Sequence, residues 1–349
     1  MCCFLGFKGM SCSHSSGIGP YVLLGSGMNR GERHSVGVLI GLGVLCVVVL
    51  GFRLMVGSDS FGWSDNEMIM EIRLNRALVG CVVGASLGLA GALLQSLLRN
   101  PLAAPGLIGL SAGAGFAVTL TTLIHGAAIS AAVAALPAMG GAVAVLVLLL
   151  ILSQRRGLID PVTMILVGVI LSVILGAGTM LMASQMQDRG FSISRWMMGT
   201  LREDFDQLTM WIAGGVLVLV LIWGVISARS FDAMALSADE ARSVGVRVGW
   251  VRFGQLLGAG ALTAISIVLA GPIGFVGLVC PHIVRVLAGP THRSLVIGSA
   301  LCGSVLVVGA DVFVRLVATD AGRIPIGVIT SLVGGPIFLV MLLRQRRNG

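Results

Sequence analysis

The segment RNPLAAPGLIGLSAGAG, from Arg99 to Gly115, separates two long apolar runs and combines two prolines with a series of small residues. Proline lacks a backbone N–H and disfavours helical geometry in the residue before it, so Pro101 and Pro105 should stop the preceding helix. The glycines and alanines that follow allow helices to approach closely in lipid. We therefore predict a rigid structural corner between two membrane helices, made by Arg99, Asn100, Pro101, Pro105 and Gly106.

The composition of the whole chain indicates an all-α polytopic membrane protein. Its 349 residues have a mean hydropathy of +1.00, 56% are hydrophobic and 11% are charged, whereas a soluble domain has about 25% charged residues. The long apolar runs show no alternating pattern, which favours membrane helices over a barrel. The formal charge of +8 does not come with basic blocks interleaved with aromatics, so we expect no nucleic-acid partner.

About ten segments are long enough and apolar enough to span a bilayer. They divide into five and five, and the Pro/Gly-interrupted stretch GPIGFVGLVCPH in the second half corresponds roughly to the opening segment in the first. Broken helices in both halves often line a transport pathway, and an odd number of spans in each half would make a repeat inverted. We assign a structural role in this pathway to Gly271, Pro272, Gly274, Gly277, Pro281 and His282. The predicted spans are residues 36–56, 76–97, 107–125, 129–152, 161–184, 208–228, 250–270, 274–289, 294–317 and 325–343.

Basic residues predict the orientation of these spans. With both termini inside, inner segments hold 15 of the 23 Lys and Arg residues, as expected for cytoplasmic loops. Residues 1–35 then form a cytoplasmic tail and residues 36–345 the transmembrane domain. Residues 1–27 are Gly/Ser-rich without a span-length apolar run, so we interpret them as disordered or as a gene-start artefact.

The chain carries no pattern for self-contained catalysis. Its only lysine is Lys8, so a Walker A motif, which needs G-K-[ST], is absent. There is no H-E-x-x-H sequence, and His282 alone does not make a metal site, so we expect no catalytic residue, cofactor or metal in this chain. Asp311 is the only acid well inside a predicted span, which leaves open an ion-coupled secondary transporter as an alternative.

The inner loop ARSFDAMALSADEARSVGVRVGWVR contains a short amphipathic helix. Ser237 can cap its start with Glu240 three residues later, as in a capping box, and Gly245 suits its end. Asp239 and Glu240 lie in the first turn, where the helix dipole favours acids. This helix is either a solvated connector or a docking surface for a cytoplasmic partner.

At the outer end of the second span, Arg73 and Arg76 are three residues apart and share one helical face. They either extend to lipid head groups or receive acidic residues of an extracytoplasmic partner. Farther along this span, Gly80, Gly84 and Gly88 form overlapping G-x-x-x-G steps, which we interpret as helix packing.

Several of these motifs, in this order, resemble one family. RLNRALVGCVVGASLGLAGALLQSLLRNPLAAPGLIGLSAGAG and GPIGFVGLVCPHIVRVLAGPTHR resemble the two signatures of the ABC importer permeases for iron-siderophores, haem and cobalamin. GADVFVRL and IPIGVITSLVGGPIFLVML resemble its last two helices, SADEARSVGVRV its coupling helix, and RWMMGTL its short outer helix. The resemblance covers about residues 36–345. Asn75 replaces the family's usual proline, and REDFDQ after RWMMGTL is more charged than expected.

The resemblance implies a multi-pass permease of the bacterial inner membrane that works by alternating access, as a homodimer or with a paralogous permease. Two cytoplasmic ATPase subunits, which bind ATP and Mg, and a periplasmic substrate-binding protein would be its partners. Iron-siderophore import is the first expectation for the cargo, with haem or cobalamin as alternatives. Arg73, Arg76 and Arg315 would meet acids of the binding protein. The ATPase would contact Ser237, Asp239, Glu240, Ala241, Arg242, Gly245 and Val246.

Overall fold

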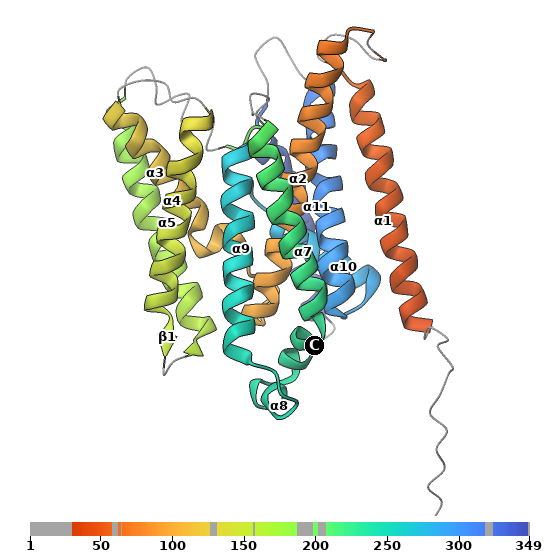
Figure 1. Ribbon diagram of the computed structural model, residues 1–349, viewed down its shortest axis with the longest axis vertical. Coiled ribbons are helices and arrows are strands. Elements are labelled where there is room, and N and C mark those ends of the chain that lie inside the picture. The colour runs from red at the N-terminus through yellow and green to blue at the C-terminus, as the bar shows by residue number, and fades with distance from the viewer. Residues whose placement is uncertain are drawn as a thin grey trace, which may run out of the picture.

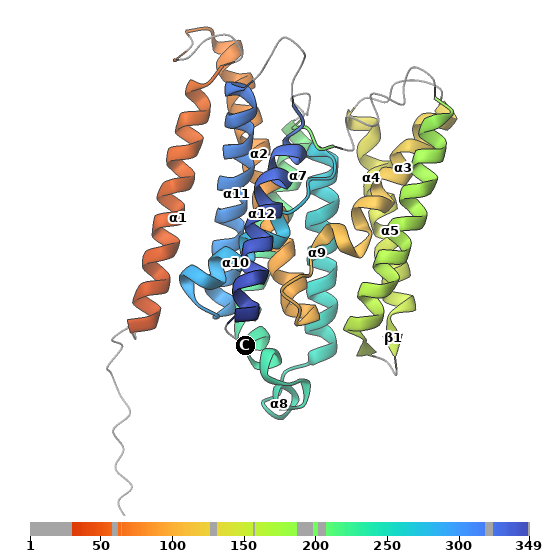
Figure 2. The same ribbon diagram turned by 180° about the vertical axis from the view of Figure 1, so that it is seen from behind.

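The computed structural model describes residues 30–57, 62–63, 65–125, 131–155, 158–186, 198–201, 207–317 and 324–347. These residues form a bundle of helices that run mostly between two ends, a lower end with α8 and an upper end opposite it (Figure 1). The first described helix begins and the last one ends at the lower end (Figures 1 and 2). The elements are α1 (Arg30–Met55), α2 (Glu67–Leu98), η1 (Pro105–Ile108), α3 (Leu110–His125), α4 (Ala131–Leu152), β1 (Gln154–Arg155), β2 (Leu158–Ile159), α5 (Pro161–Ser184), α7 (Gln207–Leu236), α8 (Ala238–Ser243), α9 (Val248–Ala270), α10 (Val276–Ala288), α11 (His292–Leu316) and α12 (Ile326–Arg347).

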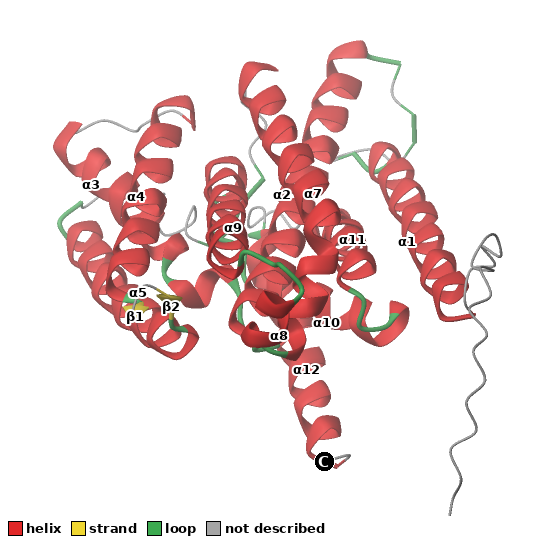
Figure 3. Cartoon of the chain, turned by 60° about the horizontal axis from the view of Figure 1, so that its bottom comes forward, coloured by secondary structure: helices red, strands yellow, loops and turns green. Residues whose placement is uncertain are grey.

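The all-helical membrane fold is confirmed, and each of the ten predicted spans corresponds to a helix. Six helices, namely α1, α2, α5, α7, α9 and α11, meet a span's length and hydropathy on their own. The apolar parts of α3, α4, α10 and α12 are shorter. A two-residue antiparallel ladder, β1–β2, joins α4 to α5 at the lower end (Figure 3); the sequence analysis did not predict it.

The centre of the bundle is the close contact between α2 and α11. A Cβ atom added to Gly84 would lie 2.2 Å from the carbonyl oxygen of Gly303, and one added to Gly88 would lie 2.0 Å from that of Ser299. Real Cβ atoms do not approach backbone this closely, so only glycine permits this crossing. The packing interpretation of the G-x-x-x-G steps is confirmed, with α11 as the partner.

Three predicted features lie wholly or partly outside the described residues. Residues 1–27, the expected disordered or artefactual segment, are one of them. The short outer helix at RWMMGTL is described only from Met198 to Leu201, and REDFDQ only at its last residue. The inverted repeat stays a prediction.

Candidate functional site

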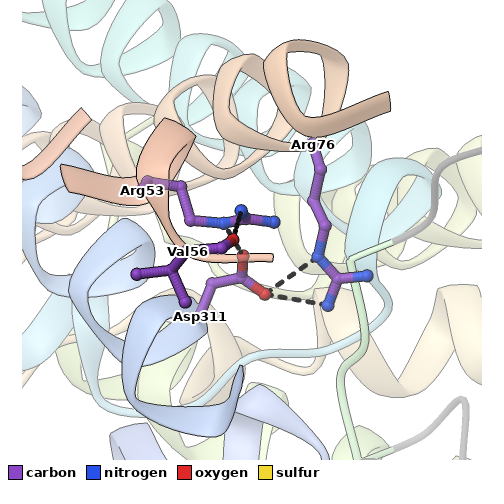
Figure 4. Close-up of polar contacts among 4 residues, drawn as sticks. All are labelled: Arg53, Val56, Arg76 and Asp311. Atoms are coloured by element: carbon purple, nitrogen blue, oxygen red, sulfur yellow. Dashed lines mark hydrogen bonds and ion pairs between the residues drawn. The ribbon is translucent and has the colours of Figure 1, made fainter. Parts of the chain in front are cut away.

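A buried carboxylate joins three helices at the upper end of the bundle (Figure 4). Asp311, near the end of α11 and 1% exposed, accepts hydrogen bonds from Nε and Nη2 of Arg76 on α2, at 2.9 and 2.8 Å. Its other oxygen accepts from Nε of Arg53, at the end of α1, at 2.5 Å. Arg53 also donates to the backbone oxygen of Val56. One acid is thus shared by two buried arginines, an arrangement we call the Asp311 cluster.

The Asp311 cluster bears on the alternative of ion-coupled transport. An ion-coupled carrier needs a carboxylate that binds and releases its ion. Asp311 instead accepts charge-assisted hydrogen bonds from two guanidinium groups, which favour its ionised form and hold it in place. Its place in the structure therefore indicates a structural ion pair and speaks against a carrier role.

The predicted docking arginines gather at the same end of the bundle. Arg76 is 5% exposed, and Arg73, which is 4% exposed, donates to the backbone oxygens of Leu54 and Gly62 at 3.0 and 2.8 Å. Arg315 lies in the last turn of α11 and is partly exposed. Docking by these three residues stays a prediction; the structure adds that Arg73 and Arg76 also have partners within the chain.

The two Pro/Gly-interrupted segments meet inside the bundle. A Cβ on Gly277, in the first turn of α10, would lie 2.8 Å from Cδ of Pro105 in η1 and 2.9 Å from the oxygen of Leu87 in α2. Leu87 precedes the end of α2 at Leu98 by about three turns, or roughly 16 Å. Both α3 and α10 therefore begin within the bundle and not at one of its two ends, which is typical of discontinuous helices in transporters.

Gln95 stabilises this junction. Because Pro281 has no N–H, the oxygen of Gly277 four residues earlier loses its helical partner. Nε2 of Gln95, buried in α2, lies 3.4 Å from that oxygen and 3.3 Å from the oxygen of Leu278. Gln95 was not among the predicted site residues, although a polar residue one turn before Arg99 in an apolar span was a signal for it.

The remaining corner residues behave as turn formers. Arg99 adopts a left-handed conformation (φ 48°) at the end of α2, and Asn100 accepts from the backbone N–H of Leu102 at 2.9 Å. Gly271, with φ 68°, ends α9. Pro101, Pro272 and Gly274 lie in the two turns. A Cβ atom added to Gly106 would have no neighbouring atom within 4 Å. Arg99 and Gly271 thus adopt turn geometry at the ends of α2 and α9, and the role of the corner in a transport pathway stays a prediction.

His282 and the acids do not form a metal site in the part of the chain that is described. Nδ1 of His282 is buried without a hydrogen-bond partner among these residues. No group of three or more His, Cys, Asp or Glu side chains there could hold a metal ion. The absence of a metal and a cofactor stays a prediction.

Two pentapeptides match the G-x-S-x-G spacing of a hydrolase nucleophile, at Gly84–Gly88 and Gly109–Gly113. That chemistry requires the serine on a sharp turn between a strand and a helix. Ser86 is instead fully buried inside α2, and Ser111 is the second residue of α3. Neither pentapeptide has the geometry of a nucleophile elbow.

The short helix α8 protrudes from the lower end (Figures 1 and 3). As predicted, the Ser237 hydroxyl accepts from the backbone N–H of Glu240 at 2.9 Å, and Gly245, at φ 84°, follows the helix end. Ala241 is fully buried against Met234 of α7 and Val248 of α9. Asp239 and Arg242 pair at 3.0 Å on the exposed side. The helix is confirmed, and its contact with an ATPase stays a prediction.

The fold, the discontinuous helices and the protruding α8 define a multi-pass membrane permease. Residues 36–344 match the model of the FecCD transport family, and the chain belongs to that family. It is therefore the inner-membrane permease subunit of an ABC importer, in which a separate subunit hydrolyses ATP and a binding protein delivers the cargo.

Known relatives extend over nearly the whole chain. The vitamin B12 import system permease protein BtuC of Vibrio cholerae is 36% identical over 329 residues, covering 93% of this chain and 97% of the relative. An uncharacterized ABC transporter permease of Bacillus subtilis, YvrB, is 35% identical, covering 86% and 84%. A solved structure assigned to the metal-chelate type of ABC transporter, in an inward-facing conformation, has a TM-score of 0.78 and 27% identity, covering 88% of this chain and 99% of its own.

Proposed function

We propose that this permease imports cobalamin. The observation that carries this proposal is the 36% identity to a vitamin B12 import permease across 97% of that relative's length. A second such permease, from Serratia proteamaculans, is 35% identical over a similar extent. Cobalamin thus replaces the iron-siderophore that we expected first.

Ferric siderophore is the second candidate for the cargo. It is favoured by the solved neighbour of the metal-chelate type, which is less identical to this chain at 27%. Both cargoes are large metal complexes and would use the same route through the membrane, so the choice between them rests on the relatives and not on a pocket in this chain.

In the proposed mechanism, two copies of the permease, or one copy and a paralogous permease, enclose the pathway. The loaded binding protein docks at the upper end, where Arg73, Arg76 and Arg315 gather. Two ATPase subunits, which bind ATP and Mg, contact the lower end at α8 through Ser237, Asp239 to Arg242, Gly245 and Val246. Closure of the ATPases moves α8 and switches access from one side of the membrane to the other.

The cargo is tested by reconstituting the permease with its ATPase and binding protein in liposomes. ATP-dependent uptake of cobalamin should exceed that of a ferric hydroxamate siderophore by roughly a hundredfold, about 3 kcal/mol of discrimination. Liposomes without ATP give the background. Uptake of the siderophore and not of cobalamin would support the second candidate and reject the first.

Docking at the upper end is best tested at Arg315, because its side chain is more exposed than those of Arg73 and Arg76. Arg315→Glu should weaken binding of the loaded binding protein by roughly tenfold or more at low salt, and less at high salt, because a rim charge acts through a screened field. Surface plasmon resonance on the permease in nanodiscs measures this affinity. Arg293→Glu makes the same charge change at the exposed lower end of α11 and should leave docking unchanged. Equal affinities for the Arg315 variant and wild type would reject the docking assignment.

A further inference from the structure

The lower end of α7, which leads into α8, is joined to α11 by a side chain of α7 that caps the start of α11. Thr291 occupies the N-cap position of α11, and its side chain makes no capping bond. Asp232 of α7 supplies the capping hydrogen bond instead. One carboxylate oxygen accepts from the backbone N–H of His292 at 3.0 Å and lies 2.6 Å from Nδ1 of the same residue. A carboxylate near a helix N-terminus is stabilised by the helix dipole, so Asp232 caps a helix that begins 60 residues later.

Aromatic packing holds His292 on its other side. Phe231, which is 1% exposed, contacts the His292 ring edge-to-face at a centroid distance of 5.9 Å. Trp223, two turns earlier on α7, contacts Phe231 in the same way at 5.6 Å. His292 itself is 8% exposed. Its position is therefore fixed by both packing and hydrogen bonds.

The same end of α7 is also attached to α2. Arg99 donates from its guanidinium group to the backbone oxygen of Met234. Met234 in turn packs on Ala241 of α8. The end of α7, and α8 with it, is thus connected to the lower ends of both α2 and α11.

The α2 and α11 helices are in close contact from their middle to their upper ends. Gly84 and Gly88 allow their backbones to touch Gly303 and Ser299 in the middle, and the Asp311 cluster joins their upper ends. Closely packed elements transmit displacement because protein interiors deform little. The contacts therefore form an unbroken path from α8 to the arginines at the upper end.

We propose that Asp232 and His292 are positioning residues that attach the coupling helix to α11. Movement of α8 on ATP binding then displaces the α2–α11 pair as a unit, and occupation of the upper end by the binding protein acts on α8 through the same pair. The inference rests on the proposed function, because it takes α8 to be the helix that the ATPases contact. It adds a path of contacts through which the ATPase subunits and the binding protein affect each other's binding.

The experiment uses the complete transporter in liposomes and measures two quantities. They are the stimulation of ATP hydrolysis by the loaded binding protein, and the number of cobalamin molecules imported per ATP. Asp232→Ala and His292→Leu should each lower both by roughly fivefold or more, which corresponds to the lower end of the usual range of coupling free energies for allosteric sites. Hydrolysis without binding protein should remain. A purely structural defect would lower uptake and hydrolysis in proportion and leave their ratio unchanged.

Two matched variants separate coupling from stability. His292→Asn places an amide N–H close to the position of Nδ1 and should restore the ratio toward wild type. Asp160→Ala removes a carboxylate that caps another helix at the lower end, through the N–H of Thr163 at 3.1 Å, and should lower stability without changing the ratio. If Asp232→Ala does not assemble, Asp232→Asn keeps an uncharged acceptor of the same size and should give an intermediate ratio.

Failure of the inference and failure of the proposed function give different results. Gly245→Val disturbs α8 itself, because a β-branched residue is strained at φ 84°. If Gly245→Val uncouples the transporter while the Asp232 and His292 variants keep a wild-type ratio, only the inference is overturned. If Gly245→Val also leaves stimulation and uptake unchanged, α8 is not the coupling helix and the inference falls with it.

Discussion

Asp311→Ala should leave little folded permease in the membrane. The substitution removes the one carboxylate that Arg53 and Arg76 share, and these arginines are 0% and 5% exposed. Breaking a buried ion pair on one side costs about 3–5 kcal/mol, because it leaves the other charge uncompensated. Here two arginines, on the helices α1 and α2, lose this carboxylate. Fluorescence-detected size-exclusion chromatography of the detergent-solubilised protein measures the folded fraction.

A compensated variant shows whether charge is the cause. Arg53→Gln with Asp311→Asn removes one positive and one negative charge, so the net charge of the Asp311 cluster stays as in the wild type. This double variant should recover a large part of the folded protein that Asp311→Ala loses. Wild-type amounts and thermal stability of Asp311→Ala would show that the cluster contributes little to the fold.

Gly88→Ala should be the second severely destabilising change. Its new Cβ would lie 2.0 Å from the backbone oxygen of Ser299. Because the obstacle is backbone, no side-chain rotation relieves it, and α2 and α11 must separate along their whole contact. Overpacking a core costs about 1–3 kcal/mol and occasionally more, and this contact lies at the upper end of that range. Thermal melting of the purified permease measures the loss.

Gly215→Ala is the matched control for this prediction. Gly215 lies in α7, is exposed, and has nothing within 4 Å of an added Cβ. There the same substitution should stabilise the helix slightly, since alanine is favoured over glycine by about 1 kcal/mol. If Gly88→Ala and Gly215→Ala melted at the same temperature, the close approach of α2 and α11 would not matter for stability.

The local features of the fold were well predicted from the sequence. Length and hydropathy located the ten spans, and Ser237, Glu240 and Gly245 located α8 and its ends. These signals work because their causes lie within a few residues, as caps, helix-stopping prolines and glycine spacing do. The order of the motifs also indicated the family, because it depends on several motifs together and not on any one of them.

The sites that depend on distant residues were predicted less well. Arg76 was expected to reach lipid head groups or acids of an extracytoplasmic partner, and the structure gives it Asp311, 235 residues away, as a partner. Arg53 was not predicted as a site residue, although a lone arginine at the end of one span and a lone acid within another were a signal for pairing. Gln95 was overlooked because nothing near it in the chain reveals the carbonyl that Pro281 leaves unpaired.

The sequence by itself determined that this protein is a helical membrane permease, which segments form its spans, and which glycines permit close packing. Only the tertiary structure decided that α11 is the partner of those glycines, that Asp311 pairs with both Arg53 and Arg76, and that Asp232 caps α11 near α8. The physical reason is how far apart in the sequence the interacting residues lie. A helix is stabilised by contacts between residues three or four apart. A buried charge pairs with a residue that the folded bundle places at the same depth, however far apart the two lie in the sequence.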